Sequence, residues 1–243
     1  MTNRMRADRL LVERGLFESR RQAQVSIAAG MVTADGAPVL KSSDAIATDA
    51  RLNARPAHPW VSRGGVKLAA ALDHFQIDPA GRICLDVGAS TGGFTDVLLA
   101  RGARRVYAVD VGRGQLHARM RARAEVVSLE TTDIRNLSPA LLSDTPDLAT
   151  IDISFISLKL ALPAAGALLA PRAELVALIK PQFEAGRRLV KKGIVRDAQV
   201  HAAVCEDATR FVAALGWTVA GVIPCPITGG DGNREFLLGA RRD

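Results

Sequence analysis

The spacing of apolar residues predicts alternating strands and helices over most of this chain. Short apolar runs bounded by turn residues recur from Ile83 onward and are typical of buried strands. Between them, apolar residues recur every three or four positions, as on one face of a helix. Strands are expected at residues 83–86, 106–109, 125–129, 148–153, 175–179, 218–222 and 236–240, with helices at 65–75, 157–169 and 198–215. This alternation predicts an α/β fold in which a twisted seven-stranded sheet is covered by helices on both faces.

The first part of the chain has a different pattern, with two short helical segments followed by a hairpin. The first helix is expected to end at Gly15, and Ser19 is the expected N-cap of a second helix over residues 20–29. The Asp-Gly pair at 35–36 is a hairpin turn signal between two short β-forming segments. These elements predict a small α+β domain over residues 1–55.

A proline-containing segment separates this domain from the α/β region. Pro56 and Pro59 lack backbone donors and interrupt both kinds of periodicity, which is typical of a linker. We therefore expect a linker over residues 56–63 and a second domain over residues 64–243.

Composition restricts the classes of protein that this chain can represent. Its 243 residues are enough for one α/β core and a small additional module, and 48% of them are hydrophobic. No apolar run is long enough to span a membrane, and the first residues lack the apolar centre of a signal peptide, so a cytoplasmic protein is expected. The three cysteines and four histidines are scattered, which argues against a disulfide framework and against a metal site.

The net charge of +7 is concentrated in two segments. Residues 101–123 contain seven arginines and one acid, Asp110, and residues 182–196 contain five basic residues and one acid, Glu184. Basic clusters of this kind favour a polyanionic partner such as RNA or DNA. Each cluster taken alone is equally compatible with the solvated face of a helix.

The segment from Ile83 to Gln115 has the order of a nucleotide-binding unit. A strand ends in Asp86, a glycine-containing turn over residues 88–93 opens an apolar-striped helix, and a second strand ends in Asp110. Asp110 lies near the offset at which an acidic residue binds a ribose in dinucleotide-binding folds. The segment therefore predicts a Rossmann-like fold and a cofactor that carries an adenosine.

The glycine spacing in the turn favours one adenosine cofactor over the others. Nicotinamide and flavin sites use G-x-G-x-x-G, in which the middle glycine lets the backbone approach a pyrophosphate. Here Ala89 and Ser90 follow Gly88, so the turn does not provide for that approach. S-adenosylmethionine has no phosphate groups and tolerates such a turn. The alternative is that Gly92 and Gly93 only make a tight connection between strand and helix.

Charged residues follow the predicted strands at the edge of the sheet where α/β proteins bind ligands. Asp152 ends the fourth predicted strand, and Lys180 comes directly after the fifth. Lys67 in the first helix of the second domain and Glu235 before the last strand are further candidates. Any one of these residues, taken alone, is more often part of a surface ion pair.

Together these residues are suited to methyl transfer onto a ribose hydroxyl. The transfer is an in-line displacement, so the protein mainly aligns the acceptor and handles its proton. A lysine accepts that proton only when it is itself deprotonated, a state that burial and nearby positive charge favour. Lys180 is the expected base, and Asp152 would orient it. Lys67 would supply a second positive charge, and Glu235 would complete the hydrogen-bond set.

A set of positions between residues 5 and 52 forms a specific pattern. Its members are Arg6, Ala7, Asp8, Arg9, Leu10, Leu11, Gly15, Leu16, Ser19, Arg20, Ala23, Ile27, Gly30, Val32 and Gly36. The pattern resembles the RNA-binding domain first seen in the fourth protein of the small ribosomal subunit. The resemblance implies that basic side chains of the two helices contact structured RNA. The RNA-contact candidates are Arg9, Arg14, Arg20 and Arg21, with Arg63 in the linker as a further candidate.

Six motifs of the second domain are the most specific features of the sequence. They are SRGGVKL at 62–68, DVGASTGGFT at 86–95, DVGRGQL at 110–116, DISFISL at 152–158, KPQFE at 180–184 and GNRE at 232–235. These motifs resemble those of the TlyA family, historically called hemolysins, which are FtsJ-like ribosomal RNA 2′-O-methyltransferases. The resemblance implies a catalytic tetrad of Lys67, Asp152, Lys180 and Glu235. It also implies contacts to S-adenosylmethionine from Ser90, Thr91, Gly92, Gly93 and Phe94, from Asp110, and around Asp133. Asp86, Gly88 and Gln115 are further candidate cofactor residues in the same motifs.

The resemblance also bears on the RNA substrate. Members with shorter termini modify cytidines of the large ribosomal subunit only, and this chain, which ends at Asp243, looks like that shorter type. We therefore expect a 2′-O-methyltransferase that acts on ribosomal RNA. One alternative is a non-catalytic, ribosome-associated RNA-binding factor. A membrane-active hemolysin is a second alternative, against which the aromatic content of only 4% argues.

Overall fold

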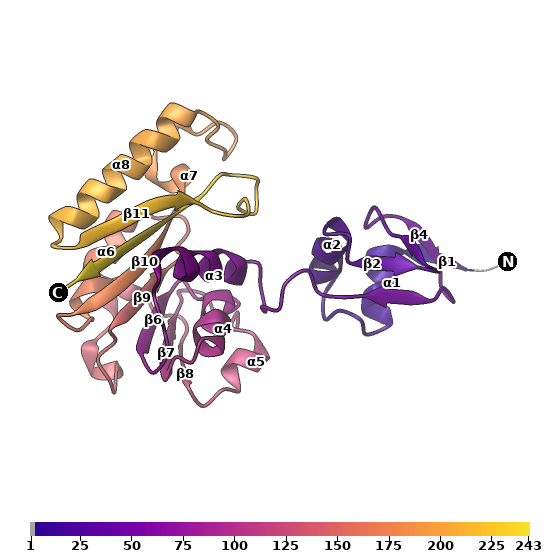
Figure 1. Ribbon diagram of the computed structural model, residues 1–243, viewed down its shortest axis with the longest axis horizontal. Helices are drawn as coiled ribbons and strands as arrows, with labels where there is room; N and C mark the ends of the chain where they lie inside the picture. The colour runs from indigo at the N-terminus through magenta and orange to yellow at the C-terminus, as the bar shows by residue number, and fades with distance from the viewer. Residues whose placement is uncertain (1–2) are drawn as a thin grey trace. The chain divides into compact units, whose positions relative to one another are not determined.

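A computed structural model describes residues 3–243 of the chain. The chain divides between Pro59 and Trp60 into two compact units (Figure 1). This division lies within the segment 56–63 that the sequence pattern predicts as a linker. The first unit extends to Pro59, and the second unit contains all the strands of the large sheet.

Residues 3–59 of the first unit form two helices and five short strands. The helices are α1 (Ala7–Glu13) and α2 (Arg20–Ala28), and the strands are β1 (Arg4–Arg6), β2 (Val32–Ala34), β3 (Ala37–Pro38), β4 (Ala45–Ala47) and β5 (Leu52–Ala54). Strand β1 pairs with β4, and β2 lies between β3 and β5. The Ser19 hydroxyl caps α2 by accepting from the Gln22 amide. Leu10, Leu11 and Ile27 pack in a core of their own, so this unit buries an apolar centre independently of the large sheet.

The second unit is built on the expected seven-stranded sheet. Its strands are β6 (Ile83–Val87), β7 (Arg105–Val109), β8 (Val126–Leu129), β9 (Leu148–Ile151), β10 (Ala173–Ile179), β11 (Thr218–Pro224) and β12 (Phe236–Arg242). They lie in the order β11-β12-β10-β9-β6-β7-β8, and β12 pairs antiparallel with both of its neighbours. The predicted strand 148–153 was two residues too long, because the chain turns away at Asp152 after β9.

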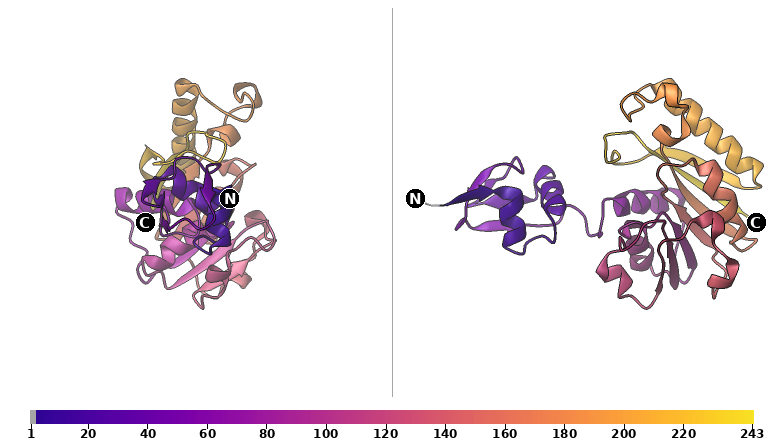
Figure 2. Two further views of the ribbon diagram at one scale, coloured as in Figure 1. Left: turned by 90° about the vertical axis from the view of Figure 1, so that its right-hand side faces the viewer. Right: turned by 180° about the vertical axis from the view of Figure 1, so that it is seen from behind.

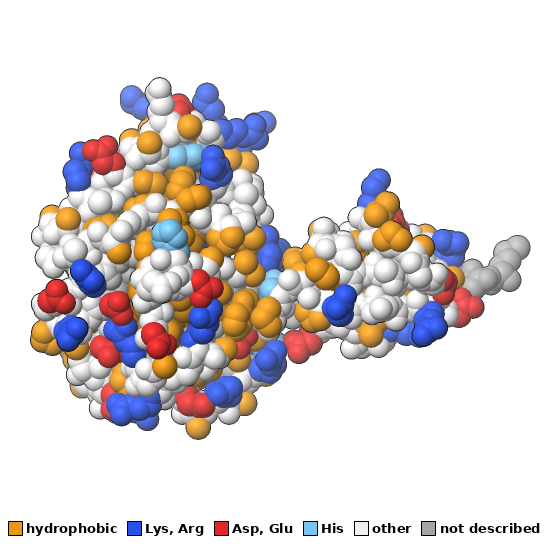
Figure 3. All heavy atoms as spheres, viewed as in Figure 1, with side chains coloured by type: hydrophobic (Ala, Val, Ile, Leu, Met, Phe, Trp, Pro, Cys, Tyr) orange, Lys and Arg blue, Asp and Glu red, His pale blue; other side chains and the backbone are white. Residues whose placement is uncertain are grey.

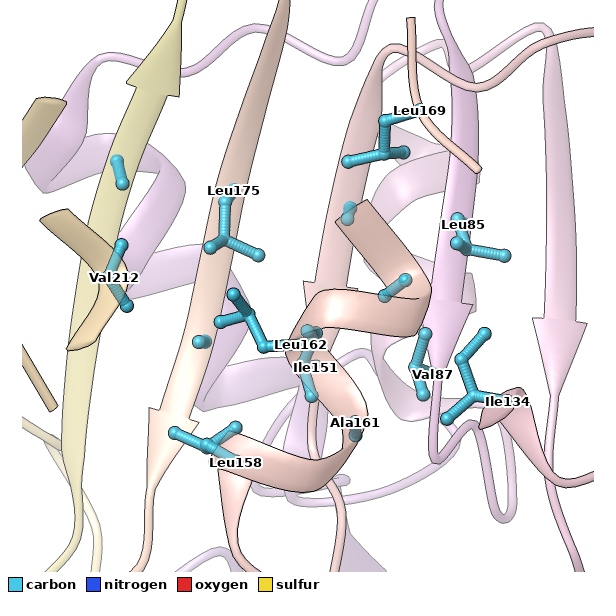
Figure 4. Close-up of a cluster of buried hydrophobic side chains, with 14 of the residues drawn as sticks. Leu85, Val87, Ile134, Ile151, Leu158, Ala161, Leu162, Leu169, Leu175 and Val212 are labelled. Carbon is cyan, nitrogen blue, oxygen red and sulfur yellow. The ribbon is translucent and has the colours of Figure 1, made fainter. Parts of the chain in front are cut away.

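Helices cover both faces of the sheet, as Figures 1 and 2 show. They are α3 (Gly64–Phe75), α4 (Gly93–Ala100), α5 (Ala118–Arg121), α6 (Leu158–Ala167), α7 (Pro181–Glu184) and α8 (Ala198–Ala214), with 3-10 turns at Ile134–Asn136, Pro139–Leu141 and Arg187–Leu189. Side chains of α6 and α8, such as Leu162 and Val212, pack with Leu85 and Ile151 on one face (Figure 4). Side chains of α3 and α4 pack on the other face. Within residues 3–243, no helix combines the length and hydropathy that crossing a membrane requires.

The strand order places the site. From β6 the chain runs outward through β7 and β8 and then crosses back to β9, on the other side of β6. Ligands of α/β sheets bind at such a switch point, beyond the carboxyl ends of the strands. Gly88 and Asp152 follow the two strands there and are in contact, because a Cβ on Gly88 would overlap the carbonyl oxygen of Asp152.

Candidate active site

Lys180 and Asp152 form one ion pair at this edge of the sheet. Lys180 follows β10 and is 8% exposed, and its Nζ lies 2.6 Å from Oδ1 of Asp152, which follows β9. Lys180 Nζ also donates a hydrogen bond of 2.8 Å to Ser154 Oγ. Asp152 Oδ1 is buried, so its pairing with Lys180 is shielded from water.

Lys67 and Glu235 form a second ion pair. Lys67 lies in the first turn of α3, and Glu235 lies directly before β12. The Lys67 ammonium donates to the Glu235 carboxylate, and the two side chains are only 11% and 4% exposed. Gly229 leaves the space that the carboxylate occupies, because a Cβ at that position would overlap Glu235 Oε1.

The two ion pairs meet around Cys225. Ile179 and Phe236 are paired residues of β10 and β12, so Lys180 and Glu235 leave the sheet side by side. Burial raises the pKa of the Cys225 thiol to about 12, and the charges of Lys67, Glu235, Asp152 and Lys180 all act on it. The four residues that the sequence singles out are thus brought to one place.

The turn after β6 forms the second part of the site. Gly88, Ser90 and Gly92 have positive φ angles of 82°, 48° and 89°, which fold the turn back over the end of the strand. Asp110 holds the turn, because its Oδ2 accepts from the Ser90 amide at 2.8 Å and its Oδ1 accepts from the Gly112 amide at 2.7 Å. Ser90 Oγ donates to Gln115 Oε1 at 3.3 Å. Ser90, Thr91 and Gln115 are exposed, so they can contact a ligand.

Several other predicted cofactor residues face the interior. Phe94 is 3% exposed and packs in the core between α3 and α4. A Cβ on Gly92 would meet Leu116 and Met120, and one on Gly93 would overlap Ser62, so both glycines also serve close packing.

Asp133 caps the 3-10 turn Ile134–Asn136, and hydrogen bonds from Arg135 lower its pKa.

Asp86 is fully buried within β6. It accepts hydrogen bonds from Thr95 Oγ1 at 2.7 Å and from Thr150 Oγ1 at 3.0 Å. Burial raises the pKa of Asp86 to about 6, although the two threonine hydrogen bonds act in the opposite direction. Its carboxylate ties β6 to α4 and β9 beneath the turn rather than pointing outward.

We expect Asp86→Asn to become more stable relative to the wild type as pH rises from 4 to 7. A carboxyl whose pKa is raised by folding stabilises the fold at low pH, and that contribution is lost as pH rises through the folded value, here about 6. A shift of this size corresponds to about 3 kcal/mol in the free energy of unfolding. Urea unfolding followed by fluorescence of Trp60 and Trp217, both in the second unit, measures the difference.

The control for this prediction is Asp78→Asn, since Asp78 is exposed and its role as a turn acceptor survives the change. If the free energies of unfolding of the wild type and Asp86→Asn depended on pH in the same way, the raised pKa of Asp86 would be contradicted.

The RNA-contact candidates of the first unit are arranged in two ways. Arg9, Arg14, Arg20 and Arg21 are all exposed, and Arg14 also donates to the Thr48 carbonyl at 2.5 Å. Arg20 lies 2.7 Å from the carboxylate of Asp8, which is fully buried. Lys and Arg side chains project from this unit in Figure 3.

Asp8 organises a network that the sequence did not reveal. Burial alone would raise the pKa of Asp8, but hydrogen bonds from Arg6, Arg20 and Gln24 hold it well below its usual range. Asp8 thereby holds the exposed side chains of Arg6 and Arg20 next to each other. Arg63 is half-buried directly before α3, in the second unit.

A basic loop precedes α8 in the second unit. Arg188, Lys191, Lys192 and Arg196 are exposed, and we call residues 186–196 the basic loop. Sequence reasoning identified this charge but missed Asn233, which is 1% exposed and donates to the Gly193 carbonyl at 2.9 Å. It also gave no role to Ser154, although this residue lies in the motif DISFISL at 152–158.

Comparisons with known proteins agree with this arrangement. A family model described as FtsJ-like methyltransferase matches residues 60–242. The chain is 45% identical over 244 residues to a Mycobacterium tuberculosis protein named 16S/23S rRNA (cytidine-2'-O)-methyltransferase TlyA, covering 99% of this chain and 91% of that protein. It is 35% identical to a Campylobacter jejuni protein named 23S rRNA (cytidine-2'-O)-methyltransferase TlyA, covering 73% of this chain and 69% of that protein. A solved structure from Streptococcus thermophilus that carries the name hemolysin is 42% identical, with a TM-score of 0.78, and covers 100% of this chain and 90% of that chain.

Proposed function

This chain belongs to the TlyA family of FtsJ-like methyltransferases, and from that membership we propose that it methylates the 2′-hydroxyl of a cytidine in large-subunit ribosomal RNA. The methyl donor is S-adenosylmethionine. The observation that carries the proposal is the meeting of two ion pairs, Lys67 with Glu235 and Lys180 with Asp152, at the switch point of the sheet. The alternative of an RNA-binding factor without activity does not explain why three of these charges are buried and the fourth, Asp152, is half-buried, because burying charges is costly.

The residues at the proposed S-adenosylmethionine site fit a cofactor without phosphates. Ser90 stands at the position where a dinucleotide site needs a glycine, and its amide is already bonded to Asp110. The carboxylate of Asp110 keeps further lone pairs for a ribose. Ser90, Thr91, Gln115, Asp110 and Asp133 are therefore the proposed contacts. Asp86, Gly92, Gly93 and Phe94 are proposed to support the turn from behind.

The bound donor supplies an electrophilic methyl group on a sulfonium. Lys180 accepts the proton of the ribose hydroxyl as the new oxygen–carbon bond forms and the sulfur–carbon bond breaks. Ser154 is exposed and accepts a hydrogen bond from Lys180, so it offers a route by which Lys180 loses its own proton to water beforehand. Asp152 holds the Lys180 ammonium that results from the transfer.

The second ion pair and Cys225 complete the environment. Lys67 contributes a positive charge beside the developing alkoxide, and Glu235 fixes its position. A thiolate would compete with the ribose for the methyl group. Because burial raises the pKa of Cys225 to about 12, this residue stays a thiol at neutral pH and does not compete.

The names of the two relatives support the choice of RNA. The Mycobacterium tuberculosis relative is named for methylation of both 16S and 23S RNA, and the Campylobacter jejuni relative for 23S RNA only. Large-subunit RNA and a cytidine 2′-hydroxyl are common to both names. A ribosomal substrate in turn favours a cytoplasmic location.

Mapping of ribose methylation tests the proposal. Ribosomal RNA from cells with and without this protein should differ at a cytidine of the large subunit, and purified protein should restore the modification to unmodified subunits. Methylation at a base rather than a ribose, or none at all, would contradict the proposal. Leakage of liposomes caused by purified, lipid-free protein would instead support the hemolysin alternative.

We also propose that the first unit delivers the enzyme to RNA through Arg9, Arg20 and Arg21. Deletion of residues 1–59 should weaken RNA binding and lower the slope of log affinity against log salt by about 0.7 to 0.9 for each lost phosphate contact. The affinity for S-adenosylmethionine should stay within about twofold, because the cofactor turn lies in the second unit. Filter binding at several salt concentrations measures the slope, and RNA affinity equal to that of the full chain would contradict the assignment.

A further inference from the structure

A cavity of about 340 Å³ lies outside the four-residue centre in the second unit. It is lined by residues 194–196 at the end of the basic loop, by His201 of α8, and by residues 231, 232 and 234. The proposed reaction uses none of these side chains. Its volume is near the lower end of the range for ligand sites in proteins.

The charge of this cavity favours an anion. Arg196 and Arg234 line it, and both are exposed and form no ion pair with another described residue. Asp231 is the only acidic residue among the lining side chains, so positive charge prevails by one unit. A guanidinium binds phosphate through two parallel hydrogen bonds, and two arginines from different loops can hold one phosphate from two sides.

Asn233 joins the two loops that form the cavity. Its Nδ2 donates to the Gly193 carbonyl at 2.9 Å, and its Oδ1 accepts from the Val195 amide at 3.1 Å. On the opposite side of Val195, its carbonyl contacts His201 Nε2 at 2.9 Å. Asn233 and His201 are 1% and 5% exposed, so these bonds are protected from water.

The same residue connects the cavity to the catalytic centre. Asn233 lies two positions before Glu235. The Asn233 carbonyl accepts from the Gly229 amide at 2.9 Å, and Gly229 is the residue whose missing side chain leaves room for the Glu235 carboxylate. The distance from the cavity to the pair of Glu235 and Lys67 is therefore set by one short, internally bonded loop.

We propose that this cavity binds a backbone phosphate of the RNA strand beside the methylated nucleotide through Arg196 and Arg234, and that Asn233 is a positioning residue that fixes this phosphate relative to Glu235. The inference rests on the proposed function, since it assigns a subsite for the same RNA. It predicts that the arginines affect RNA binding, whereas Asn233 affects the methyl-transfer step.

The arginines are tested with the full-length variant Arg196→Gln/Arg234→Gln. At physiological salt its KM for large ribosomal subunits should rise about tenfold, and the slope of log affinity against log salt should fall by about 0.7 to 0.9, as expected for the loss of one phosphate contact. The matched control, Arg172→Gln/Arg241→Gln, removes the same charge from exposed positions at the opposite edge of the sheet. It should change the slope by less than half as much.

Asn233→Ala tests whether Asn233 positions the bound phosphate relative to Glu235. Its kcat should fall about 10- to 100-fold, as a small misplacement of a catalytic group does, with KM for RNA and affinity for S-adenosylmethionine near wild type. The control is Thr209→Ala, which removes a side-chain hydrogen bond of 2.9 Å to the Cys205 carbonyl within α8, and it should keep the wild-type kcat. A wild-type kcat for Asn233→Ala, or an equal fall in kcat for Thr209→Ala, would overturn the positioning role.

Other outcomes separate this inference from the function it rests on. Wild-type protein that does not methylate ribosomal RNA refutes the proposed function. Wild-type methylation together with unchanged KM and salt slope in Arg196→Gln/Arg234→Gln refutes only the subsite. Titration with inorganic phosphate at constant ionic strength identifies the source of the anion, because a variant that loses affinity for free phosphate but binds RNA normally overturns the assignment to RNA.

Discussion

Lys180→Met should slow methyl transfer to RNA by about 100- to 10,000-fold, the range expected when a general base is removed. Methionine keeps the length and apolar stem of the side chain, so the end of β10 should remain packed. Single-turnover methylation with saturating cofactor and ribosomal subunits measures the rate. Equilibrium titration of S-adenosylmethionine should give an affinity within about threefold of wild type, because Lys180 contacts Asp152 and Ser154 rather than the cofactor turn.

The control for this prediction is Lys159→Met. Lys159 lies near the start of α6, is 42% exposed, and pairs with Asp207 on the surface. The same change there should leave the rate nearly unchanged, since exposed ion pairs contribute little. A wild-type rate for Lys180→Met would remove Lys180 from the mechanism, and loss of cofactor binding would move its role to the donor site.

Glu235→Leu should abolish activity and also destabilise the second unit by about 3 to 5 kcal/mol, because it leaves the buried Lys67 ammonium without its partner. The double variant Lys67→Met/Glu235→Leu should recover most of the lost stability, since no buried charge then remains. It should nevertheless stay inactive. Urea unfolding with tryptophan fluorescence gives the stabilities, and recovery of activity in the double variant would show that the pair serves folding alone.

Displacement of Glu235 gives a milder version of the same test. A methyl group at position 229 would overlap Glu235 Oε1, whereas nothing lies within 4 Å of a Cβ at position 230. Gly229→Ala should therefore push the carboxylate away from Lys67 and reduce kcat, while Gly230→Ala should resemble wild type. Equal activity of the two alanine variants would contradict a requirement for the exact placement of Glu235.

The apolar periodicity of the sequence was sufficient to predict the sheet and the residues at its edge. The seven strands and the helices on both faces follow from where apolar spacing changes, and Asp152 and Lys180 follow from where apolar runs stop. Strand order does not follow from periodicity, because β6 and β9 become neighbours only through a crossover. The antiparallel direction of β12, which sets Glu235 beside Lys180, is likewise a property of the tertiary fold.

The sequence pattern also could not predict which side chains pair with one another. The pattern suggested that Lys67 would act as a second positive charge near Lys180, whereas in the structure each lysine has its own carboxylate partner. Asp86 looked like a ligand because it ends an apolar run, but Thr95 and Thr150 from distant segments take up its oxygens. The buried Asp8 network depends in the same way on contacts between α1 and α2. Such contacts are determined by packing and leave no local pattern.

The division of the chain between Pro59 and Trp60 bears on turnover. In the proposed function the first unit holds a ribosomal subunit, and the second unit would then meet its target at an effective concentration set by the length of chain between the units, not by the amount of enzyme in the cell. Contacts made by the second unit can then be individually weak and still be occupied. Weak contacts release a methylated ribose quickly. Tethering by the first unit would therefore allow the enzyme both to select one nucleotide in a very large substrate and to leave it soon after methylation.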